Sequence, residues 1–200
     1  MIRKHKLAII GCGNMGRAIA RGVLASDVAS AEEVVISVRT EESAKRLSDE
    51  LGCQVICDNA SVAQEAEMIL LAVKPYQMSE VLSDIREHIS ADQIIISVIA
   101  GKNIQSIEEG LMVVRAMPNT PAMVGESMSV LCINAHMNDT DIDRVVRVFG
   151  AFGKVEQVDE GLMDVVTGVS GSSPAFIYMI MEAMADAAVK WGMRRDQAYL

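Results

Sequence analysis

Three glycines, Gly11, Gly13 and Gly16, form a G-x-G-x-x-G pattern in the stretch GCGNMG, directly after the apolar run LAII. Such a pattern between a strand and a helix is typical of dinucleotide binding, because glycine lets the backbone approach a pyrophosphate at a helix N-terminus. Taken alone the pattern is weak, and the simpler interpretation is a tight turn that binds nothing. The strand-turn-helix setting favours the dinucleotide.

The second apolar run is followed by residues that distinguish between two dinucleotides. It reads ISVRTEE and supplies Ser37, Arg39 and Thr40. A NAD site usually has a carboxylate here, about twenty residues past the glycines, whereas a guanidinium and hydroxyls suit a 2′-phosphate. Glu41 and Glu42 are the alternative carboxylates, although both fit better in the first turn of a helix. The pattern favours NADPH, with NADH as the alternative.

Three further polar breaks follow apolar runs. They are Lys74-Pro75 in LAVKPYQ, Gly101 in SVIAGKN, and the stiff stretch MPNTP, whose two prolines restrict the backbone around Asn119 and Thr120. Each break taken singly is an ordinary strand end. Because ligands of open α/β sheets bind beyond the carboxyl ends of the strands, we expect all of them to line one cleft.

The stretch TGVSGSSPAF, residues 167–176, has two interpretations that both stay open. Pro174 fits the first position of a helix and Ser173 its N-cap, which explains the composition without a ligand. The hydroxyls and exposed amides there also suit a carboxylate or the carboxamide of nicotinamide.

Alternating strand-like and helix-like runs position these residues, which is the pattern of a parallel sheet with crossover helices. The predicted strands cover residues 6–10, 34–38, 54–57, 68–73, 93–99, 112–117, 128–134 and 155–158. The predicted helices cover residues 15–24, 41–51, 61–65, 79–89 and 141–152, the last with Thr140 and Asp143 near a capping box.

No strand is predicted after residue 160. A helix runs from Pro174 to Trp191 with Glu182, Asp186 and Lys190 as a thin polar stripe on an apolar cylinder. Forty residues cannot surround it, so we expect a partner chain or a continuation. The sequence therefore predicts a Rossmann-like domain over residues 1–160, with a mostly parallel sheet and helices on both faces. Residues 161–200 would begin an all-α dimerisation domain.

Composition excludes other classes of function. The chain has 18 basic and 27 acidic residues and a net charge of −9, which argues against nucleic acid. No run of about 18 apolar residues predicts a membrane span, and no secretory signal precedes the first strand, so we expect a cytoplasmic protein. The four cysteines, Cys12, Cys53, Cys57 and Cys132, lack the spacing of a zinc site. We expect reduced thiols and no metal.

Taken together, GCGNMG, LAVKP, AGKNI, MPNTPAMVGE and LMDVVTGVSGSSPAF closely resemble pyrroline-5-carboxylate reductase, in order and spacing, along essentially the whole chain. The resemblance implies an NADPH-dependent oxidoreductase that acts on the CH-NH bond. It would transfer hydride to the cyclic imine 1-pyrroline-5-carboxylate and give L-proline, the last step of proline biosynthesis. It also implies a homodimer or higher homo-oligomer formed through the C-terminal helices.

The resemblance also implies site residues. Matching motif to motif places the cofactor contacts at Gly11, Cys12, Gly13, Asn14, Met15, Ser37, Arg39, Thr40, Asn59, Ala72, Val73, Lys74, Pro75, Ala100 and Gly101. Candidates for the cleft around nicotinamide and substrate are Met117, Asn119, Thr120, Pro121 and Ser172. The proton donor is left unassigned.

Two departures from the family keep alternatives open. Many members read Ser-Gly-Ser-Gly-Pro where this chain has Ser-Gly-Ser-Ser-Pro at residues 170–174. The family also continues into helices with a Ser-Pro-Gly-Gly-Thr-Thr segment that binds the substrate carboxylate, and nothing here matches it. The first alternative is therefore a truncated, inactive NADP-binding fragment. The second is an oxidoreductase like the β-hydroxyacid dehydrogenases, although their catalytic lysine has no counterpart between Gly171 and Lys190.

Overall fold

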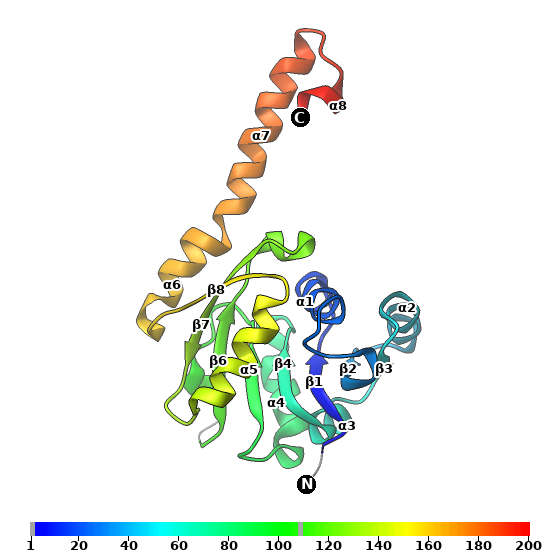
Figure 1. Ribbon diagram of the computed structural model, residues 1–200, viewed down its shortest axis with the longest axis vertical. Helices are drawn as coiled ribbons and strands as arrows, with labels where there is room; N and C mark the ends of the chain where they lie inside the picture. Colours follow the sequence, from blue (N-terminus) through cyan, green and yellow to red (C-terminus); the bar gives the residue numbers. More distant parts are fainter. Residues whose placement is uncertain (1–2, 108–109) are drawn as a thin grey trace.

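The computed structural model describes residues 3–107 and 110–200 (Figure 1). Its strands are β1 (His5–Ile10), β2 (Val34–Ser37), β3 (Gln54–Ile56), β4 (Ala66–Leu71), β5 (Ile94–Ser97), β6 (Met112–Met117), β7 (Ser127–Ile133) and β8 (Gly153–Gln157). Its helices are α1 (Asn14–Leu24), α2 (Glu41–Leu51), α3 (Asn59–Glu65), α4 (Met78–Ile85), α5 (Asp139–Gly150), α6 (Met163–Val166), α7 (Ser173–Lys190) and α8 (Arg195–Ala198). Every predicted strand and helix is present, with ends shifted by a few residues.

The strands form one sheet in the order β3-β2-β1-β4-β5-β6-β7-β8. Neighbours are parallel except β6 and β7, which pair antiparallel. The order of the first six strands is that of a Rossmann fold, with its reversal between β1 and β4. The predicted Rossmann-like, mostly parallel sheet is confirmed.

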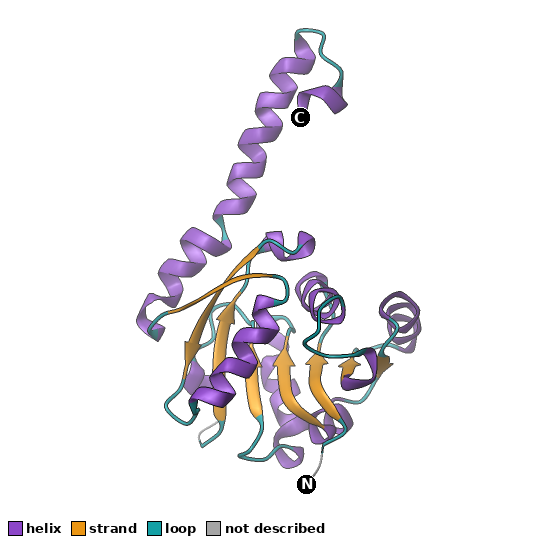
Figure 2. Cartoon of the chain, viewed as in Figure 1, coloured by secondary structure: helices purple, strands orange, loops and turns teal. Residues whose placement is uncertain are grey.

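Side chains of β1 alternate between two apolar cores, because successive residues of a strand point to opposite faces. Leu7 and Ile9 pack into the core that also holds residues of α1 and α5. Ala8 and Ile10 pack into the core that holds residues of α3 and α4. Helices therefore cover both faces of the sheet (Figure 2).

The predicted caps of two helices were wrong. Helix α5 begins at Asp139 rather than at residue 141, because the side chain of Asn138 caps it by accepting from Asp141 N at 3.1 Å. The sequence signal around Thr140 lies inside the helix. Ser173 does not cap α7, because the chain before it is already helical through α6 and the π-helical turn Thr167–Gly171. Pro174 does lie in the first turn, as predicted.

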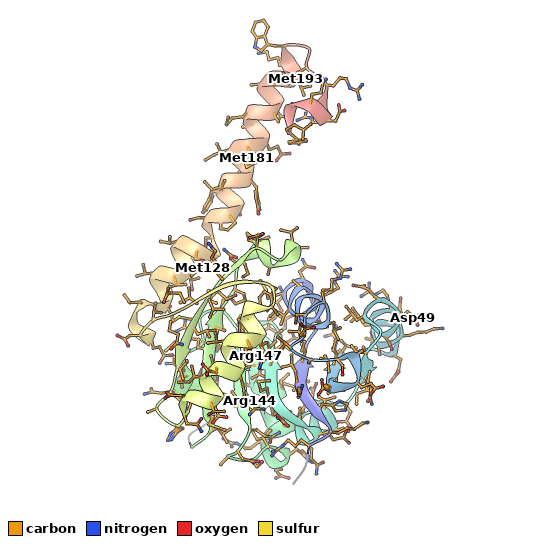
Figure 3. The ribbon with its side chains drawn as sticks, in the orientation of Figure 1. Asp49, Met128, Arg144, Arg147, Met181 and Met193 are labelled. Atoms are coloured by element: carbon orange, nitrogen blue, oxygen red, sulfur yellow. The ribbon has the colours of Figure 1, made fainter. Side chains whose placement is uncertain are left out.

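Helix α7 projects from the sheet (Figure 1), and Met181 and Met193 lie on this projecting segment (Figure 3). Its large apolar side chains are exposed, among them Phe176 at 62% and Met184 at 68%, and Ala185 is its only buried residue. An apolar helix in this state lacks the cover that its composition requires. None of the helices within residues 3–107 and 110–200 is long and apolar enough to cross a membrane.

Arg115 of β6 is a buried cation that joins the sheet to the C-terminal segment. Its side chain is 6% exposed, with Nη1 3.7 Å from Glu160 Oε1 and Nη2 3.3 Å from Asp164 Oδ1. The N–H of Ile104 donates to the same Glu160 oxygen at 2.7 Å. Glu160 therefore connects β6, the turn after β5 and the start of the C-terminal helices.

We predict that Glu160→Ala lowers the free energy of unfolding by about 2 kcal/mol, because a buried guanidinium loses an ion-pair partner and a backbone N–H loses its hydrogen-bond acceptor. Asp164→Ala is the matched control and should cost less, since its side chain is 91% exposed and screened by water. Urea unfolding at one fixed protein concentration measures both. Equal losses for the two variants would contradict the role assigned to Glu160.

Candidate functional site

A large cleft of about 1180 Å³ lies at the carboxyl ends of the parallel strands β1 to β5. Its walls come from the segments that follow these five strands, from one side of α4, and from the 3₁₀ turn Thr120–Val124. Ligands of doubly wound sheets bind at this edge, beside the point where the strand order reverses. We expected the polar segments after the strands to line one cleft. Lys74, Pro75 and Thr120 do line it, whereas Gly101 does not.

The glycine turn has the close approaches that its pattern indicates. Gly11 has φ of +87°, and a Cβ there would lie 2.6 Å from Val73 Cγ1 and 2.9 Å from the carbonyl oxygen of Ala72. A Cβ on Gly16 would lie 2.4 Å from the carbonyl oxygen of Gly11. Side chains at these two positions would displace the backbone, so only glycine allows this turn.

Gly13 differs from the other two glycines. A Cβ there would meet nothing within 4 Å, so the turn is open on this side. Gly13 is the N-cap of α1, no acidic residue lies in the first turn of that helix, and Asn14 and Met15 line the cleft. The positive end of α1 and its unpaired N–H groups suit a pyrophosphate. The residues present therefore fit a dinucleotide.

The three residues predicted to hold a 2′-phosphate differ in whether their side chains are free to bind a ligand. Ser37 is 1% exposed and its Oγ donates to Asn59 Oδ1 at 2.7 Å. Thr40 caps α2, with its Oγ1 accepting from Ser43 N at 3.3 Å. Arg39 is exposed, lines the cleft, and has no partner in the part of the chain that the structure describes. Its guanidinium remains fully available to a ligand.

Most predicted cofactor residues line the cleft, namely Gly11, Cys12, Gly13, Asn14, Met15, Ser37, Arg39, Asn59, Ala72, Val73, Lys74, Pro75 and Ala100. Thr40 and Gly101 are the two that do not, and each is the chain neighbour of a lining residue. Lys74-Pro75 opens a short 3₁₀ turn in which the N–H of Lys74 donates to Gln77 Oε1 at 3.2 Å.

Of the candidates around nicotinamide and substrate, Thr120 lines the cleft. Met117 is buried against Val130 and Met163. Pro121 is half-buried beside Thr120, and Ser172 donates its hydroxyl to the carbonyl oxygen of Thr167 at 3.0 Å. A role for these residues beside the substrate stays a prediction.

Asn119 is also one of these candidates, and its side chain is occupied within the protein. It is 8% exposed, its Oδ1 accepts from the N–H of Met128 at 2.9 Å, and its Nδ2 donates to the carbonyl oxygen of Ser170 at 3.2 Å. The amide therefore fastens the turn after β6 to β7 and to the start of the C-terminal helices. The expected approach of Asn119 to nicotinamide stays a prediction.

Two thiols line the cleft, Cys12 and Cys57, and the pKa of each is raised. Burial raises the pKa of Cys12 to about 11, and the nearby Cys53 adds to the shift. Desolvation, followed by the hydrogen bond with Glu41, raises the pKa of Cys57. Both are protonated at neutral pH and are poor nucleophiles. Within residues 3–107 and 110–200 no cluster of histidine, cysteine and carboxylate side chains could hold a metal ion.

Sequence reasoning missed one wall of the cleft. The lining residues not predicted include Cys57, Asp58, Met123 and, on or beside α4, Gln77, Glu80, Val81 and Asp84. Residues 77, 80, 81 and 84 are spaced three and four apart, which places them on one side of a helix. Polar residues at this spacing directly after Lys74-Pro75 were the available signal.

Two family models match the chain. The model described as NADP oxidoreductase, coenzyme F420-dependent, matches residues 6–101. The model described as pyrroline-5-carboxylate reductase dimerisation matches residues 160–200. The first match includes the glycine turn and the second includes the exposed helix α7.

The chain is also similar to named proteins over nearly its whole length. It is 39% identical to the pyrroline-5-carboxylate reductase of Methanosarcina acetivorans over 201 residues, 98% of this chain and 74% of the relative. It is 39% identical to that of Escherichia coli over 200 residues, with the same two shares. Among solved structures, the Plasmodium falciparum pyrroline carboxylate reductase with NADP bound superposes with a TM-score of 0.88. The two chains are 28% identical, and the superposition covers 100% of this chain and 74% of the Plasmodium falciparum chain.

Proposed function

The chain belongs to the pyrroline-5-carboxylate reductase family, and on that premise we propose how its cleft serves the reaction. The enzyme is an NAD(P)H-dependent oxidoreductase of proline biosynthesis that reduces 1-pyrroline-5-carboxylate to L-proline. The observation that carries the assignment is the continuous likeness over 98% of the chain. The glycine turn supports it, since Gly11 and Gly16 leave no room for a side chain while Gly13 leaves the turn open to a pyrophosphate.

The chain's own residues bind and orient the reactants. Reduced nicotinamide, when bound, supplies the hydride that adds to the carbon of the cyclic C=N bond. We place the pyrophosphate at Gly11 and Gly13, and nicotinamide towards Thr120 and Met123 at the other end of the cleft. Alignment of the two reacting carbons is the main contribution expected of such a cleft. Donors for the substrate carboxylate and for the imine nitrogen are not assigned.

The two alternatives raised from the sequence are not favoured. Relatives that are 39% identical to this chain over about 200 aligned residues are named as reductases. An oxidoreductase of the β-hydroxyacid dehydrogenase type would need the lysine that is absent between Gly171 and Lys190. The likeness also extends through both the sheet and α7, which an isolated nucleotide-binding module would not require.

NADPH is the proposed cofactor, with NADH also accepted. Arg39 supports this choice, because its exposed guanidinium in the cleft has no other partner among the described residues. Arginine matches the oxygens of a phosphate in geometry as well as charge.

The protein is a homo-oligomer, and we propose that α7 forms the contact between chains. The exposed apolar side chains of α7 support this, as does the dimerisation model that matches residues 160–200. On this reading residues 1–160 form the nucleotide-binding domain and residues 161–200 begin the helical one. A cytoplasmic location stays a prediction from composition, to be checked by cell fractionation.

We predict that the purified chain oxidises NADPH only when 1-pyrroline-5-carboxylate is present and forms L-proline in equal amount. Absorbance of NADPH and amino-acid analysis measure the two. Turnover of hydroxyacids alone would favour the dehydrogenase alternative, and NADPH binding without turnover would favour the inactive fragment.

The control variant for this assay is Gly13→Asp. A Cβ at Gly13 would meet no atom within 4 Å, so the fold should survive. Its carboxylate would lie where the pyrophosphate binds, so we expect turnover to fall at least about tenfold.

We predict that Arg39→Ala weakens NADPH binding by about tenfold to a hundredfold, since a charge-assisted contact to the 2′-phosphate is lost. NADH binding should change less than about twofold, because a ribose hydroxyl needs no cation. Fluorescence titration of each nucleotide measures this. Equal losses for both nucleotides would refute the phosphate contact.

We predict that Ile180→Asp dissociates the oligomer, because Ile180 is 56% exposed on α7 and a buried unpaired carboxylate is unfavourable at an apolar contact. Glu182→Ala, on the polar stripe of the same helix, should leave the assembly intact. Sedimentation analysis gives the mass of each variant. An unchanged mass for Ile180→Asp would place the contact elsewhere.

A further inference from the structure

Three residues from different elements form a chain of hydrogen bonds along the cleft. Ser37 ends β2, Asn59 begins α3, and Asp84 lies near the end of α4. Ser37 Oγ donates to Asn59 Oδ1 at 2.7 Å, and Asn59 Nδ2 donates to Asp84 Oδ2 at 2.9 Å. All three line the cleft, although Ser37 is 1% exposed and Asp84 is exposed.

The carboxylate of Asp84 fixes the direction of the whole chain. An ionised carboxylate only accepts, so the amide of Asn59 must turn its Nδ2 towards Asp84. Its Oδ1 then faces Ser37 and accepts the single hydroxyl proton of that residue. Ser37 has no proton left for a ligand, and one of the two Nδ2 hydrogens of Asn59 is also used.

This arrangement removes donors from the end of the cleft where a 2′-substituent is recognised. That position follows the second strand of a Rossmann fold, which here is Ser37 and its neighbours. A phosphate group offers only acceptors and carries close to two negative charges, so it needs donors and cations. The ribose hydroxyl of NADH is neutral and can donate as well as accept.

The charge of Asp84 acts in the same direction. Its carboxylate has no cation partner within residues 3–107 and 110–200, so nothing described neutralises it. It lies two hydrogen bonds from Ser37 in the same cleft as Arg39. Arg39 attracts a 2′-phosphate and Asp84 opposes it.

We propose that Asp84, acting through Asn59 and Ser37 and through its own charge, is a specificity residue that limits the preference for NADPH over NADH. The proposal rests on the proposed function, in that the cleft binds these two nucleotides. It predicts that the enzyme retains appreciable affinity for NADH in spite of Arg39.

The test is the affinity of Asp84→Asn for each nucleotide, measured by fluorescence titration without substrate. The neutral amide removes the charge and lets Asn59 turn over, which frees the hydroxyl proton of Ser37. We expect the ratio of NADPH affinity to NADH affinity to rise about tenfold, with NADH itself changing less than about twofold. Asp84→Ser, a smaller neutral variant, should shift the ratio in the same direction.

Glu80→Gln is the matched control. Glu80 lies one turn earlier on α4, lines the same cleft and carries the same charge, but makes no hydrogen bond to Asn59. Because Glu80→Gln removes a charge from the cleft but leaves the hydrogen-bond chain intact, its ratio should rise clearly less than that of Asp84→Asn, by about threefold at most.

An unchanged ratio in both Asp84 variants would overturn the proposal, and so would an equal rise in Glu80→Gln. These results would leave the proposed function standing, because both nucleotides would still bind. If the unsubstituted protein bound neither nucleotide, both the proposed function and this inference would be wrong.

Discussion

The backbone around Gly11 lies so close to its neighbours that no side chain fits between them, and the position of the cleft depends on this contact. A Cβ on Gly11 would strike Ala72 and Val73, just after β4, and a Cβ on Gly16 would strike Gly11 itself. The turn after β1, the first turn of α1 and the segment after β4 are therefore packed closely together. Because β1 and β4 are neighbours at the reversal of strand order, this contact opens the sheet edge to a ligand.

Charges of both signs are distributed around this edge. Arg39 and Lys74 line it together with Asp58, Glu80 and Asp84, so an anionic ligand meets attraction and repulsion in one cleft. Such a balance of charges affects the selectivity between anions more than the affinity for any one of them. The buried cation Arg115 has a different task, because its ion pairs hold the C-terminal segment against the sheet.

The sequence predicted the sheet well because its signals are local. Strand alternation and the G-x-G-x-x-G pattern depend on residues close in the chain, and both led to the right elements. The hydrogen-bond partners of the side chains could not be predicted, since they are far apart in the sequence. Asn119 bonds to Ser170, and Asp84 reaches Ser37 through Asn59, yet each had the composition of an ordinary turn or exposed helix. The antiparallel direction of β7 could not be predicted either, because side chains alternate between the two faces of a sheet in the same way whichever direction the strand runs.

A small change of angle at the base of helix α7 produces a larger displacement at its far end. The 18 residues of α7 give a length of about 27 Å, and within the described residues the helix is anchored to the sheet at its N-terminal end, where Asn119 holds the carbonyl of Ser170 in the preceding turn. A tilt of about 5° at that base would move the far end by about 2 Å, roughly the tolerance of a well-packed apolar contact. For the proposed contact between chains, the direction of α7 is therefore set at its base, by the Asn119 amide and by the ion pairs of Arg115.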